Sequence, residues 1–371
     1  MSESEGLHLV YIGSPENGLA QAGHVIDLDG VTTVVFGRRT QGRELGLVRR
    51  GQLAEIGIAL PWVSGRHCEL DITTFDPLRA TLIDLGSRNG TRLASAMVRG
   101  SAPLDVGQVF EIGRSFWMLR EGRVSRSDVD PPHPLLDEDT GHLQRAARSR
   151  MPVLVSGPRG AGKRRVASWM HRTSGRPGRF VSVDLAGPTS ALRERLTPDA
   201  TSVPPVLREA KAGTLCLASV DALSLQAQSL VREVLAAAAE AEGLDVRVIV
   251  TSTRDLRQAV AQGKFGRELF ARLSGCQVHV PGLHERADQL GVLIRTFFTG
   301  DLGPELHVTT EAFRFALDYE WPHNMQQLNH ALTNAMTIAS REGWVGRPVL
   351  EQAVEQAEAK AHLDPFRAAD A

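Results

Sequence analysis

Val153-Leu-Val-Ser-Gly-Pro-Arg-Gly-Ala-Gly-Lys163 is the stretch that decides the fold of this chain. It begins as an apolar strand, continues into a glycine-rich loop with the spacing G-x-x-x-x-G-K, and leads into a helix expected over 164–171. Glycines let backbone amides curl around a phosphate, and a helix N-terminus adds partial positive charge. The stretch therefore predicts a nucleotide-binding loop in which Lys163 reaches the terminal phosphates. The alternative is a glycine-rich turn in a parallel sheet.

The residues around this loop alternate between strand and helix patterns. Strands are expected over 153–156, 180–184, 214–217, 246–252 and 278–280. Such alternation is typical of a parallel sheet with helical crossovers, which binds nucleotides at the carboxyl ends of its strands. Helix-period apolar residues then predict a helical region with helices over 286–298, 310–318, 325–341 and 349–362.

Composition limits the class of protein. A chain of 371 residues with a net charge of −1 is long enough for two or three domains, and its charge indicates neither nucleic acid nor an anionic membrane as a partner. Widely spaced Cys68, Cys216 and Cys276 predict buried thiols in a reducing compartment. No signal-peptide pattern is apparent, and no apolar run approaches the ~18 residues of a membrane helix. We therefore expect a cytoplasmic protein.

Short strands separated by turns fill the first third of the chain, with strand patterns over 8–12, 31–36, 68–72, 79–84 and 109–112. Many short strands at regular spacing favour a β-sandwich. The turns carry ordered clusters: Phe36-Gly37-Arg38, then 63–67, then 84–91 with Asn-Gly at its tip, then 104–113. Their order resembles the forkhead-associated (FHA) domain over roughly residues 8–120. The resemblance implies a β-sandwich whose loops bind phosphothreonine peptides.

The FHA resemblance also implies roles for single residues. Arg38 and Ser64 would bind the phosphate, and Asn89 would hold the peptide backbone. Gly37, His67 and Gly90 would be structural residues of the loops. Gly65 stands where the family often has a polar side chain, so one donor would be lost. Arg66 and Arg88 either add charge to the site or are solvated surface arginines, and Trp62 either lines the peptide pocket or belongs to the sandwich edge.

Landmarks of a second family come after the phosphate loop. They are Phe180-Val-Ser-Val183, Gly213-Thr-Leu215, Leu225-Gln-Ala227, Asp245-to-Ile249, Thr253-Arg-Asp-Leu256, Phe265-to-Leu273, Pro281-to-Arg286 and Trp321-Pro322 with Asn324. Their order resembles the AAA+ module of sigma-54-dependent transcriptional activators over about 150–335. The resemblance implies ATP bound by the loop residues Gly157, Pro158, Arg159, Gly160, Ala161, Gly162, Lys163 and Arg164, although Arg164 replaces an acidic residue of the family.

Departures from this family concern hydrolysis. Ala218 and Ser219 stand where the family has the Asp-Glu pair that holds Mg²⁺ and orients water. Asp221 is the next acidic residue, displaced along the strand. Gly266 fills the first arginine-finger position, Arg272 the second, and Arg267 comes one residue late. Gln326 occupies the place of a further lid arginine. We therefore treat Ala218, Ser219, Thr253, Gly266, Arg272 and Gln326 as vestigial, and expect no catalytic residue, no metal site and poorly held Mg²⁺.

Two interaction elements of the activators are also not found. The interval 187–212 contains nothing like the Gly-Ala-Phe-Thr-Gly-Ala sigma-contact motif, and the segment after the lid is too short for a helix-turn-helix. We therefore expect neither remodelling of the sigma-54 polymerase nor specific DNA binding.

The sequence thus predicts a multidomain chain: an all-β FHA sandwich over 1–122, a linker over 123–137, a degenerate α/β AAA+ core over 138–283, and a helical lid with a C-terminal helix over 284–371. The leading hypothesis is a regulatory pseudo-ATPase that docks on a phosphothreonine protein of a Ser/Thr kinase pathway. Its AAA+ module would pack against the same module of another copy or against the AAA+ modules of activators, and would so regulate transcription. The alternatives are a divergent activator with residual ATPase activity and a structural adaptor that holds no nucleotide.

Overall fold

The computed structural model describes residues 6–39, 45–73, 79–94, 96–122, 140–198, 203–240, 243–299, 307–339 and 343–362. The predicted linker 123–137 and the tail 364–371 lie outside the described residues. The chain separates into two compact units. The first comprises Met1–Glu138, Leu283–Pro322 and Gln327–Ala371, and the second comprises Asp139–Gly282 with His323–Gln326. Each unit is described by itself.

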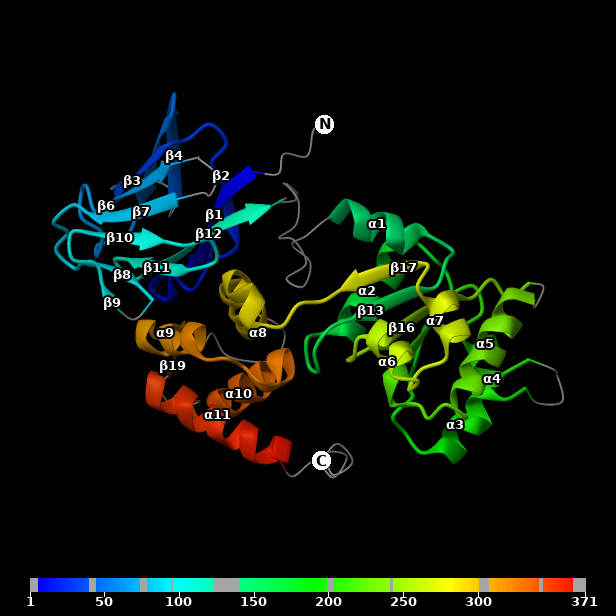
Figure 1. Cartoon of the computed structure of the whole chain (residues 1–371). Coiled ribbons are helices and arrows are strands. Elements are labelled where there is room, and N and C mark those ends of the chain that lie inside the picture. Colours follow the sequence, from blue (N-terminus) through cyan, green and yellow to red (C-terminus); the bar gives the residue numbers. More distant parts are fainter. Residues whose placement is uncertain are drawn as a thin grey trace. The chain divides into compact units, whose positions relative to one another are not determined.

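Two β-sheets form the N-terminal part of the first unit (Figure 1). One has the strand order β2-β1-β12-β11-β8-β9 and the other β10-β7-β6-β3-β5-β4. The strands are β1 (Gly6–Gly13), β2 (His24–Asp27), β3 (Thr33–Arg38), β4 (Leu45–Arg50), β5 (Leu53–Ile58), β6 (Cys68–Thr73), β7 (Arg79–Asp84), β8 (Thr91–Leu93), β9 (Ala96–Met97), β10 (Ser101–Leu104), β11 (Val109–Ile112) and β12 (Ser115–Gly122). The predicted sandwich is confirmed.

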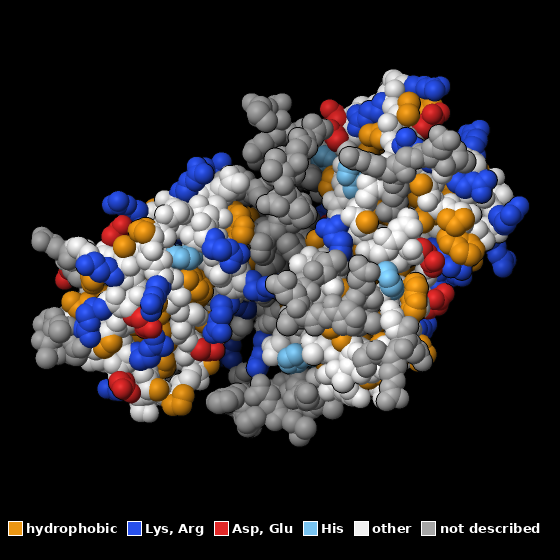
Figure 2. All heavy atoms as spheres, turned by 180° about the vertical axis from the view of Figure 1, so that it is seen from behind, with side chains coloured by type: hydrophobic (Ala, Val, Ile, Leu, Met, Phe, Trp, Pro, Cys, Tyr) orange, Lys and Arg blue, Asp and Glu red, His pale blue; other side chains and the backbone are white. Residues whose placement is uncertain are grey.

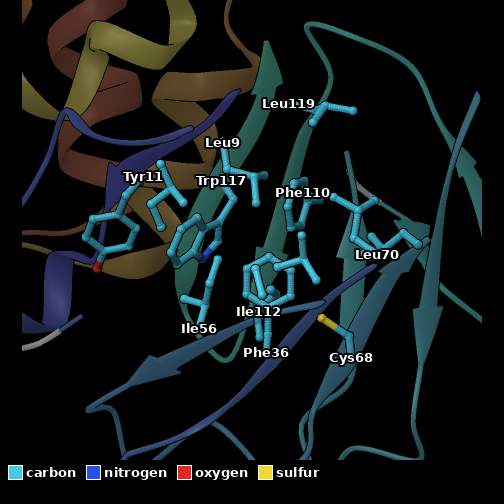
Figure 3. Packing of buried hydrophobic residues seen from close by; sticks show 14 of the residues in the cluster. Leu9, Tyr11, Phe36, Ile56, Cys68, Leu70, Phe110, Ile112, Trp117 and Leu119 are labelled. Carbon is cyan, nitrogen blue, oxygen red and sulfur yellow. The ribbon is translucent and has the colours of Figure 1, made fainter. Parts of the chain in front are cut away.

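The core between these sheets is aromatic and aliphatic (Figure 3). The Phe36 and Trp117 rings meet edge to face at 5.3 Å, and Tyr11 packs on Trp117 at 4.7 Å. Offset and edge-to-face aromatic pairs add to the free energy gained by burial. Leu9 and Cys68 complete the same cluster. Buried and more exposed residues alternate along β3, β5, β6 and β7, as in strands with one face in the core.

A five-stranded parallel sheet forms the second unit, in the order β14-β15-β16-β13-β17. Its strands are β13 (Val153–Ser156), β14 (Phe180–Asp184), β15 (Thr214–Ala218), β16 (Arg247–Ser252) and β17 (Cys276–His279). The helices are α1 (Thr140–Arg148), α2 (Lys163–Thr173), α3 (Thr189–Leu196), α4 (Pro205–Glu209), α5 (Gln228–Glu240), α6 (Leu256–Ala261) and α7 (Arg267–Leu273), with a 3-10 turn η2 (Val220–Ala222). The predicted α/β core is confirmed, and the glycine-rich loop lies between β13 and α2.

Buried Arg247 joins α1 to this sheet. Its guanidinium donates to the carbonyls of Ala146 and Ala147 at the C-terminal end of α1, although Arg247 is only 1% exposed. Burial lowers the pKa of Arg247 to about 10. A cation at this end of a helix satisfies carbonyls that have no partner within the helix.

Helices of the lid belong to the first unit, apart from the first residues of one of them, Asn324–Gln326, which belong to the second. The lid helices are α8 (Leu290–Thr299), α9 (Thr310–Asp318), α10 (Asn324–Ala339) and α11 (Arg347–His362), preceded by the 3-10 segment η3 (His284–Gln289). Strands β18 (His307–Val308) and β19 (Trp344–Val345) pair in parallel. The single helix expected over 286–298 is wrong at its start, because buried Arg286 has non-helical dihedral angles (φ −128°, ψ 38°).

The lid covers a second face of the β-sandwich. This face consists of the side chains of β1 and β12 that point away from the sandwich core. They are at most 5% exposed and comprise Val10, Ile12, Phe116 and Met118. Phe116 packs edge to face on Phe313 of α9 at 5.1 Å. The apolar runs Leu9–Ile12 and Phe116–Leu119 are those of strands buried on both faces.

Among the described residues no helix is long and apolar enough to cross a bilayer. Figure 2 shows basic, acidic and apolar side chains interspersed on the visible face. Cys68 and Cys216 are buried free thiols, as expected, whereas Cys276 is partly exposed.

Candidate phosphopeptide and nucleotide sites

The end of β3 and the loop after residue 62 lie together at one end of the sandwich. The backbone amide of Arg38 donates to the Ser64 carbonyl at 2.8 Å. Gly37 permits this approach, because a Cβ atom there would lie 2.2 Å from the Gly65 carbonyl oxygen. The side chain of Arg38 is exposed and that of Ser64 is half-buried. The two predicted phosphate ligands are therefore neighbours.

The turn between β7 and β8 meets the same loop. The Ser64 hydroxyl accepts the backbone N–H of Arg88 at 3.1 Å, and the Asn89 amide donates to the Trp62 carbonyl at 2.7 Å. Arg66, Arg88 and Asn89 are exposed. The predicted phosphopeptide residues thus gather on adjoining loops, with Gly65 also exposed between them. Their ligand roles remain predictions.

Buried His67 fastens these loops from below. Its Nδ1 accepts the Ser64 backbone N–H at 3.0 Å, so the proton lies on Nε2, which donates to the Gly90 carbonyl at 3.1 Å. Burial lowers the pKa of His67, although the Gly90 hydrogen bond and the Asp84 charge oppose the shift. These hydrogen bonds connect the two loops through His67, and the structural roles of His67, Gly37 and Gly90 stay predictions.

Asp84 fixes the shape of the Asn-Gly turn. Its carboxylate accepts the hydroxyls of Ser87 and Thr91, each at 2.7 Å, and the backbone N–H groups of Gly86 and Ser87. Burial raises the pKa of Asp84, but the hydrogen bonds from Ser87 and Thr91 outweigh it, so the net pKa is lowered. This turn presents Arg88 and Asn89 on a pre-formed scaffold.

A further contact beside these loops was not predicted from the sequence. The Arg114 guanidinium lies 3.7 Å above the centroid of the Trp62 ring and pairs with Glu16 at 2.8 Å. The residue that stacks on Trp62 thus lies on the turn between β11 and β12. We expected Trp62 either to line the peptide pocket or to belong to the sandwich edge, and neither expectation included this contact. A basic residue in a two-residue Gly-Arg hairpin turn is the sequence signal that could have drawn attention to it.

Glycines shape the nucleotide loop between β13 and α2. A Cβ atom on Gly157 would lie 2.1 Å from the Val280 carbonyl oxygen, and one on Gly160 would lie 2.1 Å from that of His323. Gly162 precedes α2 with a left-handed φ of 99° and no side-chain cap. Such a loop leads directly into a helix N-terminus that can face an anion.

Lys163 folds back on its own loop. Its Nζ donates to the carbonyls of Gly157 and Pro158 at 2.7 and 2.8 Å. Burial lowers the pKa of Lys163 to about 8, and the charge of Asp221 partly opposes this shift. Arg164, the second residue of α2, makes an exposed pair with Asp184 at 3.6 Å.

The segment 323–326 closes the other side of the loop within the same unit. The Asn324 amide donates to the Arg159 carbonyl at 2.8 Å, and the Cβ of Gln326 lies 3.4 Å from the place of a Cβ on Gly160. The sequence matches Asn324 to a family landmark without assigning it a contact. Gln326, where the family has an arginine, is exposed beside the phosphate loop.

The other vestigial positions lie near the carboxyl ends of β15 and β16 or on α7. Ala218 ends β15, and Ser219 comes next in the left-handed region, its amide bonded to Thr251. The Asp221 carboxylate accepts hydrogen bonds from the backbone N–H and the hydroxyl of Thr253. Arg272 pairs with Glu268 at 3.1 Å along α7. Within the described ranges, no cluster of His, Cys, Asp or Glu could hold a metal ion.

The buried side chain of Gln228 fixes the backbone at Gly266. This contact was not predicted from the sequence. Oε1 of Gln228 accepts the Gly266 N–H at 2.9 Å, and Nε2 donates to the Lys264 carbonyl at 3.2 Å and to Leu223. A 3%-exposed amide with both ends satisfied fixes the loop that precedes α7.

Fold and sequence together place two known domain types in this chain. A model of the FHA domain matches residues 34–113, and a model of the sigma-54 interaction domain matches residues 138–283. The chain therefore carries an FHA domain joined to a sigma-54 interaction domain, and the two predicted resemblances are confirmed. This combination supports a regulatory role.

Individual relatives are bacterial regulators. The response regulator protein PilR of Pseudomonas aeruginosa is 30% identical over 264 residues, which are 64% of this chain and 59% of PilR. The anaerobic nitric oxide reductase transcription regulator NorR of Aeromonas salmonicida is 30% identical over 247 residues, 61% of this chain and 48% of NorR. The chain thus spans about half to three fifths of the length of these relatives.

A solved structure shares the fold of the second domain type. NtrX from Brucella abortus, in complex with ATP, is 25% identical with a TM-score of 0.50, covering 60% of this chain and 57% of NtrX.

Proposed function

We propose that this chain is a signalling regulator that binds phosphothreonine proteins through its FHA domain and holds ATP without hydrolysing it. Phosphothreonine binding is supported by one observation: a backbone hydrogen bond joins Arg38, at the end of β3, to Ser64 in the neighbouring loop. Arg88 and Asn89 adjoin that loop through bonds to Ser64 and Trp62. A guanidinium with hydroxyl, backbone and amide donors is the chemistry that a phosphate dianion on a peptide requires.

The nucleotide half rests on the geometry of the loop 157–163. It combines glycines in close backbone approach, an uncapped helix start and a lysine. NtrX, whose structure contains ATP, shares this fold. Hydrolysis is not proposed, because Ala218 and Ser219 carry no carboxylate at the end of β15 and Gln326 brings no charge to the loop. An arginine finger and a positioned base each contribute orders of magnitude in rate.

The resulting regulator acts through protein contacts. One partner is a phosphothreonine protein made by a Ser/Thr kinase. The others are AAA+ modules, either of further copies of this chain or of sigma-54 activators, and through them it tunes sigma-54-dependent transcription. PilR and NorR carry the names of transcription and response regulators, which supports a role in the same kind of pathway.

Peptide binding by the full chain tests the first half. An oriented phosphothreonine peptide library is titrated against the wild type, Arg38→Ala, Ser64→Ala and Arg50→Ala. Arg50 is an exposed arginine at the opposite end of the same sheet, since it pairs with Leu53, whereas Arg38 pairs with Ile58. We expect the Arg38 and Ser64 variants to lose at least ten-fold in affinity, as loss of charged hydrogen bonds implies, and Arg50→Ala to bind normally. Equal binding of phosphorylated and unphosphorylated peptides would overturn the proposal.

A structural adaptor that holds no nucleotide is the second candidate. The fold-back of Lys163 onto the carbonyls of Gly157 and Pro158 favours it, because those bonds must break before the ammonium can reach a phosphate. Titration of the wild type and of Lys163→Ala with a fluorescent ATP analogue separates the two. Binding that depends on Lys163 supports the regulator that holds ATP, and its absence in both proteins supports the adaptor.

A further inference from the structure

One face of α9 docks on the turn and strands of the FHA domain. Thr310, Phe313 and Arg314 lie at positions i, i+3 and i+4, which share one side of a helix. Thr310 donates to Glu16, Phe313 packs on Phe116, and Arg314 binds Glu111. The face therefore meets the sandwich through a hydroxyl, a ring and a cation within little more than one helical turn.

The docking is held by buried charge pairs. Arg314 donates from Nε and Nη2 to the two oxygens of Glu111, each at 2.8 Å, and Glu111 is 7% exposed. Arg120 of β12 pairs with Asp288, which is 2% exposed. Gly291 of α8 sits so close to β1 that a Cβ atom would lie 1.8 Å from the Ile12 carbonyl oxygen. Such contacts hold the lid helices firmly against the sandwich.

A chain of contacts leads from the candidate phosphopeptide loops to this face. Asn89 bonds to the Trp62 carbonyl, and the Trp62 ring carries the Arg114 guanidinium at 3.7 Å. Arg114 then donates to Oε1 of Glu16 at 2.8 Å. The same oxygen accepts the Thr310 hydroxyl at 2.9 Å. One carboxylate oxygen thus joins the turn beside Trp62 to the first residue of α9.

Arg114 keeps its place at a conformational cost. The hairpin between β11 and β12 is a two-residue turn in which Gly113 has φ 51° and Arg114 has φ 65°. A residue with a Cβ atom is disfavoured in this left-handed region, where glycine or asparagine is usual. A strained residue that makes specific contacts on both sides indicates a functional constraint.

We propose that Trp62, Arg114, Glu16 and Thr310 form a relay that couples phosphopeptide binding to the N-terminus of α9 in the lid. The relay rests on the proposed phosphothreonine function of the FHA domain. A peptide bound by Ser64 and Asn89 restrains the loop that carries Trp62. Because the ring supports Arg114, the Arg114–Glu16–Thr310 contacts are then held more firmly, and the first turn of α9 opens less often.

The relay acts in both directions. Coupling between two sites is reciprocal, so a change at Thr310 must alter peptide affinity as much as peptide alters the first turn of α9. Thr310 is 2% exposed and lies on the lid, outside the phosphopeptide loops, which makes it the diagnostic position.

Hydrogen–deuterium exchange of the full chain, with the tightest phosphothreonine peptide from the library and with its unphosphorylated counterpart, tests the relay. The reporters are the amides of Ala312 and Phe313, which bond to Thr309 at the start of α9. We expect the phosphopeptide to slow their exchange in the wild type. In Thr310→Val the slowing should vanish and peptide affinity should fall about five-fold or more. Thr337→Val, which removes an exposed hydroxyl from α10, is the matched control and should behave as the wild type.

A second arm needs no peptide. Arg114→Asn keeps a residue that accepts the left-handed turn but removes the guanidinium. It should speed exchange both in the first turn of α9 and in the loop around Arg88 and Asn89. Unchanged exchange in this variant, or peptide protection confined to the FHA loops, overturns the relay. Failure of every peptide to bind overturns the proposed function instead, and the Arg114 arm still decides whether the structural link exists.

Discussion

The carboxylate of Asp221 accepts both the backbone amide and the side-chain hydroxyl of Thr253. Asp221 is the acidic residue near the end of β15 that the sequence offers as a replacement for the lost pair. Its oxygens are engaged by the neighbouring strand end, and its charge acts on Lys163 only by opposing the lowering of the lysine pKa. Asp221 therefore has a structural partner in Thr253.

Hydrolysis should therefore be independent of these residues. We expect steady-state ATP turnover with Mg²⁺ to equal the buffer background in the wild type, in Asp221→Asn and in Lys163→Ala, because Ala218 and Ser219 offer no carboxylate at the end of β15. A coupled phosphate-release assay on the full chain makes the measurement. Turnover that disappears with Lys163 would restore the activator-ATPase alternative.

Nucleotide affinity should depend on pH through Lys163. Its pKa is lowered to about 8 in the folded chain, so the ammonium is charged at pH 7 and mostly neutral at pH 9. Affinity for an ATP analogue should fall about ten-fold across that range, in proportion to the protonated fraction. Calorimetric titration at several pH values checks this. Lys163→Ala, with no such group, should bind weakly and show no comparable slope.

Gln326→Arg should strengthen nucleotide binding. The Gln326 side chain begins beside Gly160 of the phosphate loop, so a guanidinium there would reach toward the phosphates. Charge-assisted hydrogen bonds of this kind are worth about 1.5 kcal/mol or more, roughly ten-fold in affinity. The matched control is Gln258→Arg, which adds the same charge at an exposed site on α6. Equal gains in both variants would mean that net charge alone is responsible.

Acid should destabilise the FHA domain at His67. Burial lowers its folded pKa below the ordinary 6.5, so the unfolded chain binds more protons just below that value. The stabilising contribution is present above pH 6.5 and is lost as the pH falls toward the folded pKa. Ring titration by NMR should give a value below 6.5, and the free energy of unfolding should fall between pH 7.5 and 5.5. A His67 ring that titrates above 6.5 would contradict the assignment.

Arg314→Ala should unfold the first unit more easily. It leaves the buried Glu111 carboxylate without its bidentate partner. Breaking a buried pair from one side typically costs about 3–5 kcal/mol. Arg347→Ala, which removes an exposed i,i+4 pair with Glu351, should cost about 0.5 kcal/mol or less. Urea unfolding of both variants makes the comparison, and similar midpoints would show that Glu111 is not buried in solution.

Local patterns are enough to predict much of this fold. The apolar run 153–156 and the glycine spacing after it predict β13, the loop and α2, because their constraints are short-range. The loop clusters of the FHA domain can also be recognised from the sequence, and Arg38 and Ser64 lie side by side in the structure. In both cases each motif is only a few residues long, so it can be recognised in the sequence before it is known which motifs meet in space.

Long-range contacts could not be predicted in the same way. The docking of α9 depends on Glu111 and Arg314, and no local pattern pairs residues so far apart. The helix expected to begin at Arg286 instead kinks there, because tertiary contacts override helical periodicity at a buried residue. Only the unbroken apolar runs in β1 and β12 indicate that the sandwich has a second covered face.

That second face determines which fragments of the protein would stay soluble on their own. A fragment cut after β12 would leave Val10, Ile12, Phe116 and Met118 facing water, with the carboxylate of Glu111 beside them. An apolar patch of that kind promotes self-association. The FHA domain of this chain should therefore not stay monodisperse as an isolated fragment, because it needs helices encoded more than 150 residues downstream to cover this face.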